Sequence, residues 1–365
     1  MSIDAFFIPQ LQYLAENDFD VTVVCSPDDG LQKRLGTTIR YAPLEIPRGI
    51  SAIGTINAIH SLIRFFREEK FDLIQYSTPN AAFCASVAAK RAGCIVRNYH
   101  MMGFRYLGST GVLRTVLKML DTIACKNSTH IECVSKSNLE LGIKEKVFPA
   151  EKAVVVWNGS SGGVDLKRFD YSKREEWRKE VRKELGLVDS DFVFGFAGRI
   201  CRDKGINELL EAFFSLKGDS KLLLVGVIEG EGNLDNTLLN KAKSSPNVVF
   251  HGFANDIERY YAAMDVLALP SYREGFGMVV AEAAAVGTPA IVSDIPGPRD
   301  VIEDGVTAYI AVPRNVVSLQ EMMELIMRAE YKQIGESAYS FVKKHFDSKV
   351  LNQEILKRKR MLLGD

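Results

Sequence analysis

The feature that most constrains the fold is a repeated alternation of short β-branched runs with longer amphipathic segments. This alternation is typical of parallel strands joined by crossover helices. Strands are predicted at residues 20–26, 71–77, 93–100, 130–135, 153–159, 192–198, 221–227, 247–253, 265–271 and 289–294. Because ligands of doubly wound sheets bind beyond the carboxyl ends of the strands, the loops that follow these strands are where chemistry is expected.

Two domains are expected because the strand pattern starts afresh part-way along the chain. A glycine-rich segment, GSSGGVDLKRFD, is followed there by the charged run YSKREEWRKEVRKELG, a pattern typical of a hinge that leads into a surface helix. A chain of 365 residues, 47% of them hydrophobic, is long enough for two cores. The sequence therefore predicts an α/β protein with two doubly wound, Rossmann-like domains facing each other across a cleft. These span residues 1–164 and 165–345, and a last helix over about residues 346–365 packs back on the first domain.

The composition argues against nucleic acid, disulfides and metal. Lysine plus arginine number 46 and aspartate plus glutamate number 46, so the net charge is zero and no nucleic-acid partner is expected. The six cysteines form no C-x-x-C pair and lie mostly in apolar runs, which indicates buried thiols in a reducing compartment. The two Asp-x-Asp triplets, at residues 18–20 and 189–191, precede predicted strands and are interpreted as turn residues. No metal site and no cofactor are expected.

The start of the chain shows no secretion signal and lacks an expected strand. A basic region with a long apolar stretch is absent, and no uninterrupted apolar run reaches membrane-spanning length, so a cytoplasmic location is expected. A helix is predicted over residues 6–17, whereas a doubly wound domain usually opens with a strand. Either the first strand of the N-terminal domain is missing, or Met1 is an internal residue of the first loop, which we favour. The neighbouring strand would then have an exposed edge, and the first domain would be weaker.

Two cations follow the predicted strand over residues 192–198. Gly198 stands at the turn, Arg199 and Lys204 lie in the loop, and a helix is predicted to start near Ile206. Backbone N–H groups and the dipole at a helix start add to the two side-chain charges, so this loop suits a diphosphate. The alternative is that both cations are ordinary solvated loop residues.

A second strand-end loop, residues 252–256, is a candidate place for a flat base. Phe253 lies in this loop, and backbone groups there could hold the edge of the base. The alternative, an ordinary loop before an amphipathic helix, is the one that the sequence alone favours.

Two glutamates flank a Gly-Phe-Gly turn in the stretch SYREGFGMVVAEAAAVG. Glu274 follows the predicted strand 265–271, and Glu282 lies in the first two turns of a helix predicted to begin near Phe276 or Gly277. Ionised carboxylates only accept hydrogen bonds, so this pair suits the hydroxyls of a sugar and a ribose. The alternative makes Glu274 a helix-capping acid and Glu282 a surface residue. Against it, the helix around Glu282 is otherwise apolar all round, which indicates burial against the sheet.

Together these motifs resemble a known enzyme family. Ser271-x-x-Glu274-Gly275-Phe276-Gly277 followed by Glu282 is similar to the E-x7-E signature of the retaining, nucleotide-sugar-dependent glycosyltransferases of family 4, which have the GT-B fold. Gly198-Arg199 with Lys204-Gly205, the segment NGSSGGVDLKRF and the later stretches GTPAIVSD and EDGVTAYI also match that family in the right order. The resemblance covers nearly the whole chain. NGSSGGVD and YHMMGFRYLGSTGVLR look most like the subgroup that builds capsular polysaccharide, exopolysaccharide or lipid-linked glycans in bacteria.

The resemblance implies a role for each matched residue. Arg199 and Lys204 would neutralise the diphosphate of the donor and of the leaving group. Glu282 would bind the ribose hydroxyls, and Glu274 would hold a hydroxyl of the donor sugar. His100, at the end of its predicted strand, would contact the donor sugar near the reacting carbon, although a histidine taken alone is more often structural. The other residues expected to meet the nucleotide sugar are Gly198, Phe253, Gly275, Phe276, Gly277 and Met278.

The implied activity is that of a hexosyltransferase without a metal. It would move a hexose or N-acetylhexosamine from a nucleotide-diphosphate sugar, with UDP favoured, by front-side attack in which the departing phosphate takes the acceptor proton. Two alternatives stay open. One is a GT-B-shaped epimerase or phosphorylase, which needs no glycan acceptor. The other is a non-catalytic partner in glycan assembly, against which the intact Arg199, Lys204, Glu274 and Glu282 argue.

The acceptor side is expected in a basic segment of the first half. Between residues 97 and 126, five cations face one acid, Asp121. The predicted helix GVLRTVLKML, rimmed by Arg114 and Lys118, could rest on anionic lipid at the inner face of the plasma membrane. A core-facing helix is the equal alternative. With lipid contact, the expected acceptor is a polyprenyl-diphosphate-linked sugar; otherwise an oligosaccharide acceptor stays open.

Overall fold

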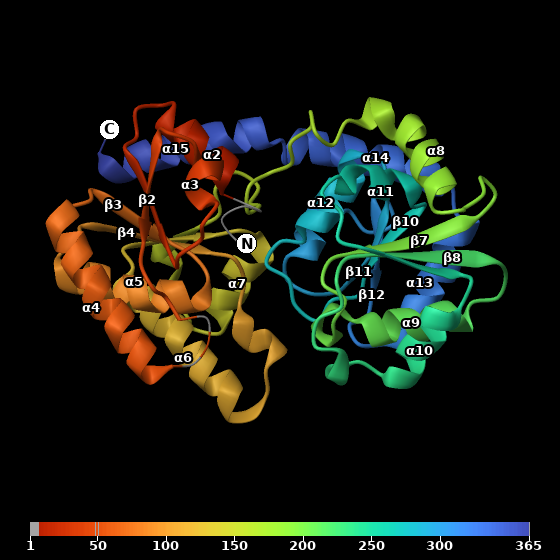
Figure 1. The fold of residues 1–365 in the computed structure, drawn as a ribbon, viewed down its shortest axis with the longest axis horizontal. Coiled ribbons are helices and arrows are strands. Elements are labelled where there is room, and N and C mark those ends of the chain that lie inside the picture. The colour runs from red at the N-terminus through yellow and green to blue at the C-terminus, as the bar shows by residue number, and fades with distance from the viewer. Residues whose placement is uncertain (1–6, 48, 50, 365) are drawn as a thin grey trace. The chain divides into compact units, whose positions relative to one another are not determined.

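The computed structural model describes residues 7–47, 49 and 51–364. The chain forms two compact units: unit 1 contains residues up to Gly163 and resumes at Ser348, and unit 2 contains Val164–Asp347. Each unit is an α/β assembly of parallel strands with helices on both faces (Figure 1). Within the described residues, no helix combines the length and the apolar character needed to cross a bilayer.

Unit 1 contains two parallel sheets. The first consists of β1 (Val21–Cys25) and β2 (Ile39–Pro43). The second has the order β3-β4-β5-β6, formed by β3 (Leu73–Tyr76), β4 (Val96–Met101), β5 (His130–Cys133) and β6 (Ala153–Val154). Within the described residues, β1 pairs only with β2. The question of a strand before the first helix falls outside the described residues.

The helices of unit 1 cover both faces of its strands (Figure 1). On one face lie α4 (Ala52–Glu69), α5 (Pro79–Ala92) and α6 (Gly111–Asn127). On the other lie α2 (Ile8–Ala15), α3 (Leu31–Leu35) and the last helix, α15 (Ser348–Leu363). The unit also contains α7 (Lys136–Lys144) and two 3-10 turns, η1 (Arg105–Gly108) and η2 (Ala150–Lys152).

Local sequence signals explain where several of these helices begin. The Ser51 hydroxyl accepts a hydrogen bond from the Gly54 N–H at 3.2 Å and so caps α4. Ser135 caps α7 in the same way, and Pro79 stands at the first position of α5, where its missing N–H costs no helical bond. Cys84, Cys94, Cys125 and Cys133 are buried in the main core of this unit, as expected for thiols in apolar runs.

Unit 2 is built on one six-stranded parallel sheet of order β12-β11-β10-β7-β8-β9. Its strands are β7 (Phe192–Ala197), β8 (Ser220–Val225), β9 (Val248–Gly252), β10 (Val266–Leu269), β11 (Ala290–Ser293) and β12 (Ala308–Ala311). β7, β8, β10 and β11 are buried almost throughout, as in sheets covered on both faces. The strand ends of β7, β8 and β10 therefore lie next to one another at one edge.

Two helical layers cover this sheet (Figure 1). One layer contains α9 (Ile206–Ser215), α10 (Asn236–Ser244) and α13 (Val316–Arg328). The other contains α8 (Arg174–Glu184), α11 (Ile257–Ala263), α12 (Met278–Ala285) and α14 (Tyr331–His345). Short 3-10 turns complete the unit: η3 (Tyr171–Lys173), η4 (Arg202–Lys204), η5 (Glu231–Asn233) and η6 (Pro298–Val301).

The sequence predictions of strands are confirmed with three differences. The run at 153–159 forms only the two-residue β6, and β2 and β12 were not predicted. The prediction that the charged run forms a surface helix is wrong in part, because Arg182 of α8 is 1% exposed. Its guanidinium lies 2.7 Å from the Asp265 carboxylate, which also receives Arg178. Asp265, the buried carboxylate before β10, thus pairs with arginines on one face of α8, and this face is packed instead of solvated.

Candidate functional site

The cations and carboxylates predicted in unit 2 follow strands that are neighbours in the sheet. Gly198 and Arg199 follow β7, and the loop with Glu274 follows β10, which pairs with β7. β8 pairs with β7 on its other side, and its loop carries Glu229. Because all these strands are parallel, the three loops emerge at the same carboxyl edge.

Glycines bring the three loops into close backbone contact. At Gly205, which has φ +71°, an added Cβ would lie 2.1 Å from the Pro270 carbonyl oxygen. At Gly226, with φ +146°, it would lie 1.8 Å from the Gly198 carbonyl oxygen. Only glycine allows these approaches without displacement of the backbone. The loops after β7, β8 and β10 therefore act as one packed cluster.

Lys204 and Glu274 meet in this cluster. The Lys204 Nζ lies 2.5 Å from Glu274 Oε1, and the Ser271 hydroxyl donates to the same oxygen at 2.8 Å. The Lys204 and Glu274 side chains are only 19% and 14% exposed. These contacts contradict the alternative reading of Lys204 as a freely solvated loop residue and give Glu274 partners other than a helix start. A cation and an acceptor-only group thus lie side by side at the strand ends.

Arg199 lies at the outer rim of the cluster and is about half exposed. Its guanidinium contacts Glu229 Oε2 at 3.0 Å and Asp203 Oδ2 at 3.7 Å. Asp203 also receives Arg273 at 3.0 Å. Burial opposes ionisation of Asp203, but the Cys201 thiol and the neighbouring cations hold the pKa of its carboxyl below the usual value. Three cations, Arg199, Lys204 and Arg273, therefore lie at the carboxyl edge of the sheet, and each is held by an acid.

Glu282 lies on α12 and is hydrogen-bonded from a neighbouring helix. The Tyr261 hydroxyl of α11 donates to Glu282 Oε2 at 3.0 Å. Burial raises the pKa of the Glu282 carboxyl to about 7, against the lowering effect of the Tyr261 hydrogen bond and of Arg168. The surface alternative for Glu282 is wrong, because its side chain is partly buried and held by Tyr261.

In the Gly-Phe-Gly turn before α12, the glycine backbone sets the turn and the phenylalanine side chain packs in the core. Gly277 has φ +94°, a left-handed conformation, so α12 begins at Met278, slightly later than the predicted start at Phe276 or Gly277. The Phe276 ring is 2% exposed and packs edge-on against Phe346 at 5.1 Å. The Phe276 side chain therefore belongs to the core, and contact of this turn with a nucleotide sugar stays a prediction for its backbone.

The last predicted site residue in unit 2 is Phe253. It follows Gly252 at the end of β9, next to β8, and its side chain is 71% exposed. Gly252 has φ +85°, which turns the chain at this strand end. An exposed aromatic ring at the carboxyl edge suits contact with a flat base.

His100 belongs to unit 1, near the end of β4. It is 7% exposed, and Phe7 packs against the imidazole edge-on with ring centroids 5.4 Å apart. Burial lowers the pKa of His100 to about 4, with the nearby Lys359 ammonium adding to this effect and Glu132 opposing it. His100 is therefore a neutral imidazole at physiological pH, and its Nε2 has no hydrogen-bond partner within the described residues.

The predicted lipid-facing helix is α6. Arg114 and Lys118 both pair with Glu145, at 3.2 and 2.7 Å, and both lie over the Tyr106 ring. The expected basic rim is thus partly neutralised by an acid of the same unit. Asp121 faces the core and is 2% exposed. One face of α6 packs inward, as the core-facing alternative predicts, while Val112, Leu113 and Met119 are exposed. Contact with lipid stays a prediction.

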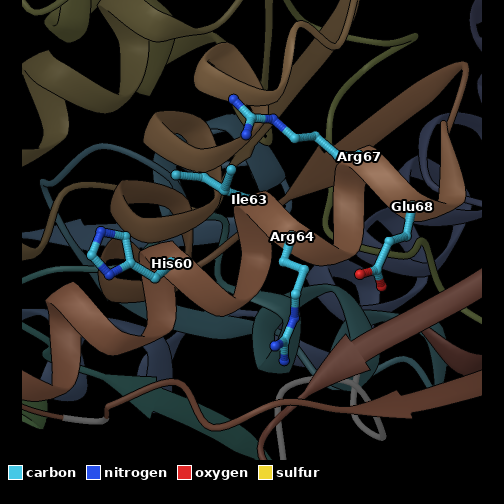
Figure 2. Close-up of a pocket in the computed structure, with 5 residues that line it drawn as sticks. All are labelled: His60, Ile63, Arg64, Arg67 and Glu68. Atoms are coloured by element: carbon cyan, nitrogen blue, oxygen red, sulfur yellow. The ribbon is translucent and has the colours of Figure 1, made fainter.

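A wide hollow of about 540 Å³ lies elsewhere in unit 1, on α4 (Figure 2). Figure 2 shows that the labelled side chains come from this single helix and point apart rather than toward a common centre. They are His60, Ile63, Arg64, Arg67 and Glu68. None of them was predicted as a site residue, and the hollow does not converge on a reacting centre.

Two family models match the chain, one in each unit. A model described as "Glycosyltransferase Family 4" matches residues 10–162, and a model described as "Glycosyl transferases group 1" matches residues 178–341. The chain belongs to the family 4 glycosyltransferases. It is a glycosyltransferase with the GT-B fold.

Relatives of this glycosyltransferase match most of its length. It is 29% identical over 353 residues to the capsular polysaccharide biosynthesis glycosyltransferase CapM of Staphylococcus aureus, covering 95% of this chain and 91% of CapM. It is 28% identical over 312 residues to the UDP-Gal:alpha-D-GlcNAc-diphosphoundecaprenol alpha-1,3-galactosyltransferase of Escherichia coli, covering 83% of this chain and 79% of that protein. The solved structure of Anabaena HepE in complex with UDP superposes with a TM-score of 0.78 at 20% identity, over 97% and 96% of the two chains, and shares the fold.

Several residues that contact the predicted site residues were not themselves predicted. Ser271 supports Glu274, and its signal was its place at the start of the S-x-x-E pattern. Asp203 and Glu229 hold Arg199, and only the proximity of Asp203 to Lys204 in the chain pointed to it. Tyr261 reaches Glu282 across 21 residues, which no local pattern signals.

Proposed function

We propose that this protein is a retaining glycosyltransferase that moves a hexose or N-acetylhexosamine from a UDP-sugar to a polyprenyl-diphosphate-linked acceptor in bacterial surface glycan synthesis. The observation that carries the proposal is the Lys204–Glu274 pair, 2.5 Å apart at the carboxyl edge of unit 2, with Arg199 beside it. In this proposal unit 2 binds the donor and unit 1 binds the acceptor. The name of the E. coli relative specifies UDP-galactose and a diphosphoundecaprenol-linked acceptor, which supports both substrate classes.

Arg199 and Lys204 bind the donor diphosphate in this scheme. Both are held by acids, Glu229 and Asp203 for Arg199 and Glu274 for Lys204. A diphosphate brings two negative charges to these cations and replaces part of that pairing with charge-assisted bonds. The cations then stabilise the charge that develops as the nucleotide diphosphate leaves. Because they are preorganised by their acids, little reorganisation accompanies the reaction.

The two glutamates bind hydroxyl groups. Glu282 accepts from the ribose while Tyr261 donates to its other lone pairs, and Glu274 accepts from a hydroxyl of the donor sugar. The backbone N–H groups of Gly275, Gly277 and Met278 meet the sugar and phosphates, and Gly198 lets the β7 loop approach them. Phe253 contacts the base with its exposed ring.

The transfer step proceeds by front-side attack. The bond between the anomeric carbon and the phosphate oxygen breaks first, and an oxocarbenium-like sugar forms. The acceptor hydroxyl bonds to the same face, and its proton goes to the departing phosphate oxygen. His100 contacts the donor sugar near the reacting carbon as a neutral imidazole. The scheme assigns no step to a metal or a cofactor.

A donor screen tests the proposal and separates it from its alternatives. The purified protein is incubated with radiolabelled UDP-galactose, UDP-glucose, UDP-N-acetylglucosamine and UDP-N-acetylgalactosamine, with and without an undecaprenyl-diphosphate-linked N-acetylglucosamine acceptor. We expect label to move into the lipid fraction only when the acceptor is present. Interconversion of the sugars without acceptor would indicate an epimerase instead. Release of sugar phosphate that needs inorganic phosphate would indicate a phosphorylase, and no turnover of any donor would favour a non-catalytic partner.

Contact with the inner face of the plasma membrane is the second part of the proposal, and it would place the protein in the cytoplasm. α6 exposes Val112 at 81%, Leu113 at 48% and Met119 at 53%, next to the cations Arg114 and Lys118. Apolar side chains beside cations are typical of helices that rest on anionic lipid. We expect phosphatidylglycerol vesicles to bind the protein. A Val112→Ser/Leu113→Ser variant and an Arg114→Ala/Lys118→Ala variant should each bind less, and unchanged binding in both would remove this part.

A further inference from the structure

A buried ion pair lies directly beside His100 in unit 1. His100 on β4 and Glu132 on β5 are register partners, so they lie opposite each other on adjacent strands. Glu132 Oε2 is 2.6 Å from the Nζ of Lys359, which comes from α15. Glu132 and Lys359 are each 3% exposed. A buried pair of this kind is retained at a cost in desolvation, which calls for a role beyond stability.

Three polar atoms around this pair remain unsatisfied. The Nε2 of His100, the Nε2 of Gln10 and the Oε1 of Glu132 are buried and have no hydrogen-bond partner within the described residues. Glu132 Oε1 also lies 3.5 Å from the Nε of Arg358, without the geometry of a hydrogen bond. Buried polar atoms are rarely left unpaired in folded proteins, so three in one place need an explanation.

The residues that carry these three atoms line one small cavity. Gln10, His100, Glu132 and Lys359 all line one enclosed space of about 10 Å³. That is about the smallest volume that holds a single water molecule, and a buried water typically makes about three hydrogen bonds. The donor of Gln10, the acceptor of Glu132 and the ring nitrogen of His100 match the bonding capacity of one water.

We propose that Glu132, held by Lys359, and Gln10 position the imidazole of His100 through one bound water molecule. The water accepts from Gln10 Nε2, donates to Glu132 Oε1 and makes its third hydrogen bond with His100 Nε2. Phe7 packs against the ring, so the water and this aromatic contact together fix its orientation. Lys359 keeps Glu132 ionised, since its ammonium outweighs burial and lowers the pKa of the Glu132 carboxyl to about 2. Glu132 and Lys359 are positioning residues, and the inference rests on the proposed role of His100.

One consequence links distant parts of the chain. Lys359 and Glu132 are 227 residues apart, and α15 follows the whole of unit 2 in the sequence. The orientation of His100 therefore depends on the last helix of the chain being docked on unit 1. Neither residue touches the substrate in this account, so their effect must pass through the imidazole.

The test removes the charges without leaving one buried alone. A Glu132→Leu/Lys359→Met variant replaces the pair with apolar groups of similar size, an exchange that is often neutral or stabilising, so the protein is expected to fold. A Glu132→Gln/Lys359→Met variant keeps an acceptor and a donor at position 132 and serves as the second variant. The matched control is Glu354→Gln/Lys357→Met, which removes an exposed ion pair of the same helix with a separation of 2.6 Å.

Kinetics with the most active UDP-sugar of the donor screen give the first readout. We expect kcat of the Leu/Met variant to fall roughly ten- to hundredfold through misplacement of His100, while KM for the donor stays within about twofold. The kcat of the Glu132→Gln/Lys359→Met variant should fall less, and the kcat of the control variant should equal that of the parent protein. The decisive comparison introduces Glu132→Leu/Lys359→Met into a protein that already carries His100→Ala. In that background the double change should lower kcat no further. An equal loss in both backgrounds would overturn the positioning role.

A crystal structure of the parent protein gives the second readout, independent of activity. We expect density for one water within hydrogen-bond distance of Gln10, His100 and Glu132, and we expect the His100 ring to rotate in the Leu/Met variant. A dry cavity would overturn the inference even if transfer is confirmed. Full activity in His100→Ala would overturn the role of His100, and with it this inference, while leaving the transferase activity itself intact.

Discussion

At the scale of residues, the proposed donor site consists of cations held by acids. Lys204, Arg199 and Arg273 each contact a carboxylate in this structure, at distances from 2.5 to 3.7 Å. The acids keep the cations at the edge of the sheet, and the neighbouring cations help to hold the pKa of the Asp203 carboxyl below its usual value. Binding of an anion therefore changes the partners of a network that already exists.

Removing one cation should abolish most of the transfer activity without unfolding the protein. We expect Arg199→Ala and Lys204→Ala each to lower kcat/KM by roughly 10² to 10³-fold, because each supplies charge where the leaving group develops it. Lys217 is an exposed cation of the same unit that precedes β8, at the opposite edge of the sheet. Lys217→Ala should therefore leave transfer unchanged. Near-normal rates in both site variants would remove the assignment.

Glu282 should make UDP binding depend on pH. Its carboxyl has a pKa raised to about 7, whereas the ribose hydroxyls need the ionised form as acceptor. Raising the pH from 6 to 8 moves Glu282 from mostly protonated to mostly ionised, so UDP affinity should rise roughly tenfold over this range. Glu282→Gln removes the titrating group and should flatten the profile, apart from the ionisation of UDP itself. Profiles of equal slope in the two proteins would contradict the role.

At the scale of elements, glycines set how closely the strand-end loops approach. Gly205 has φ +71°, and a Cβ added there would lie 2.1 Å from the Pro270 carbonyl oxygen, whereas Gly305 has φ +73° and nothing within 4 Å of an added Cβ. The two positions share a backbone conformation and differ in crowding. They therefore separate backbone strain from steric contact.

Gly205→Ala should be more damaging than Gly305→Ala. At Gly305 we expect a loss of about 1 to 2 kcal/mol in the free energy of unfolding, from the left-handed conformation alone. At Gly205 the methyl group would also lie 2.1 Å from the Pro270 oxygen, so stability should fall further and the Lys204–Glu274 contact should shift. Urea unfolding and transfer kinetics of both variants give the comparison. Equal losses would show that the close approach is not needed.

Much of the fold was predictable because the spacing of apolar residues and the residues that favour turns can be recognised in a short stretch of sequence. The buried strands β7, β8 and β10 are apolar runs between turns, and a helix start near Ile206 followed from the loop before it. β2 and β12 escaped prediction because short strands such as IRYAP and AYIA carry weak patterns. Arg182 of α8 was assigned to the surface because its buried partner, Asp265, is 83 residues away.

The candidate site residues also fall into those that have a local sequence signal and those that have none. Arg199, Lys204, Glu274 and Glu282 stand out because charged residues next to glycine turns and inside an apolar helix are unusual in a local window. The partners Tyr261, Glu229 and Lys359 are ordinary residues of amphipathic segments. Only the fold brings them to Glu282, Arg199 and Glu132, respectively. Contacts between residues that are far apart in the chain arise only in the tertiary structure, so they could not be predicted from the sequence.

At the scale of the whole molecule, the last helix is separated from its unit by the other unit. α15 follows unit 2 in the chain and packs in unit 1, where Lys359 meets Glu132. Both partners are 4% exposed in their side chains, so neither can be solvated if the other is removed. Removal of one partner alone would therefore leave the other charge buried in unit 1.

Breaking this pair on one side should loosen unit 1 more than unit 2. Glu132→Gln leaves the Lys359 ammonium buried without a charged partner, which costs about 3 to 5 kcal/mol. Amide hydrogen exchange should then speed up in β4, β5 and α15 and stay unchanged in β7, β8 and β10. The Glu132→Leu/Lys359→Met variant should recover most of the protection. An equal loss of protection from exchange in both units would contradict a role of the Glu132–Lys359 pair that is confined to unit 1.

The most direct test of the account is calorimetric titration of UDP into the parent protein, an Arg199→Ala/Lys204→Ala variant and the Lys217→Ala control. The parent and the control should bind UDP with the same dissociation constant, and the double variant should bind at least about 100-fold more weakly while keeping its melting temperature. Equal affinity of the double variant and the parent protein, or no binding of UDP to any of the three, would contradict a donor site at the carboxyl edge of unit 2.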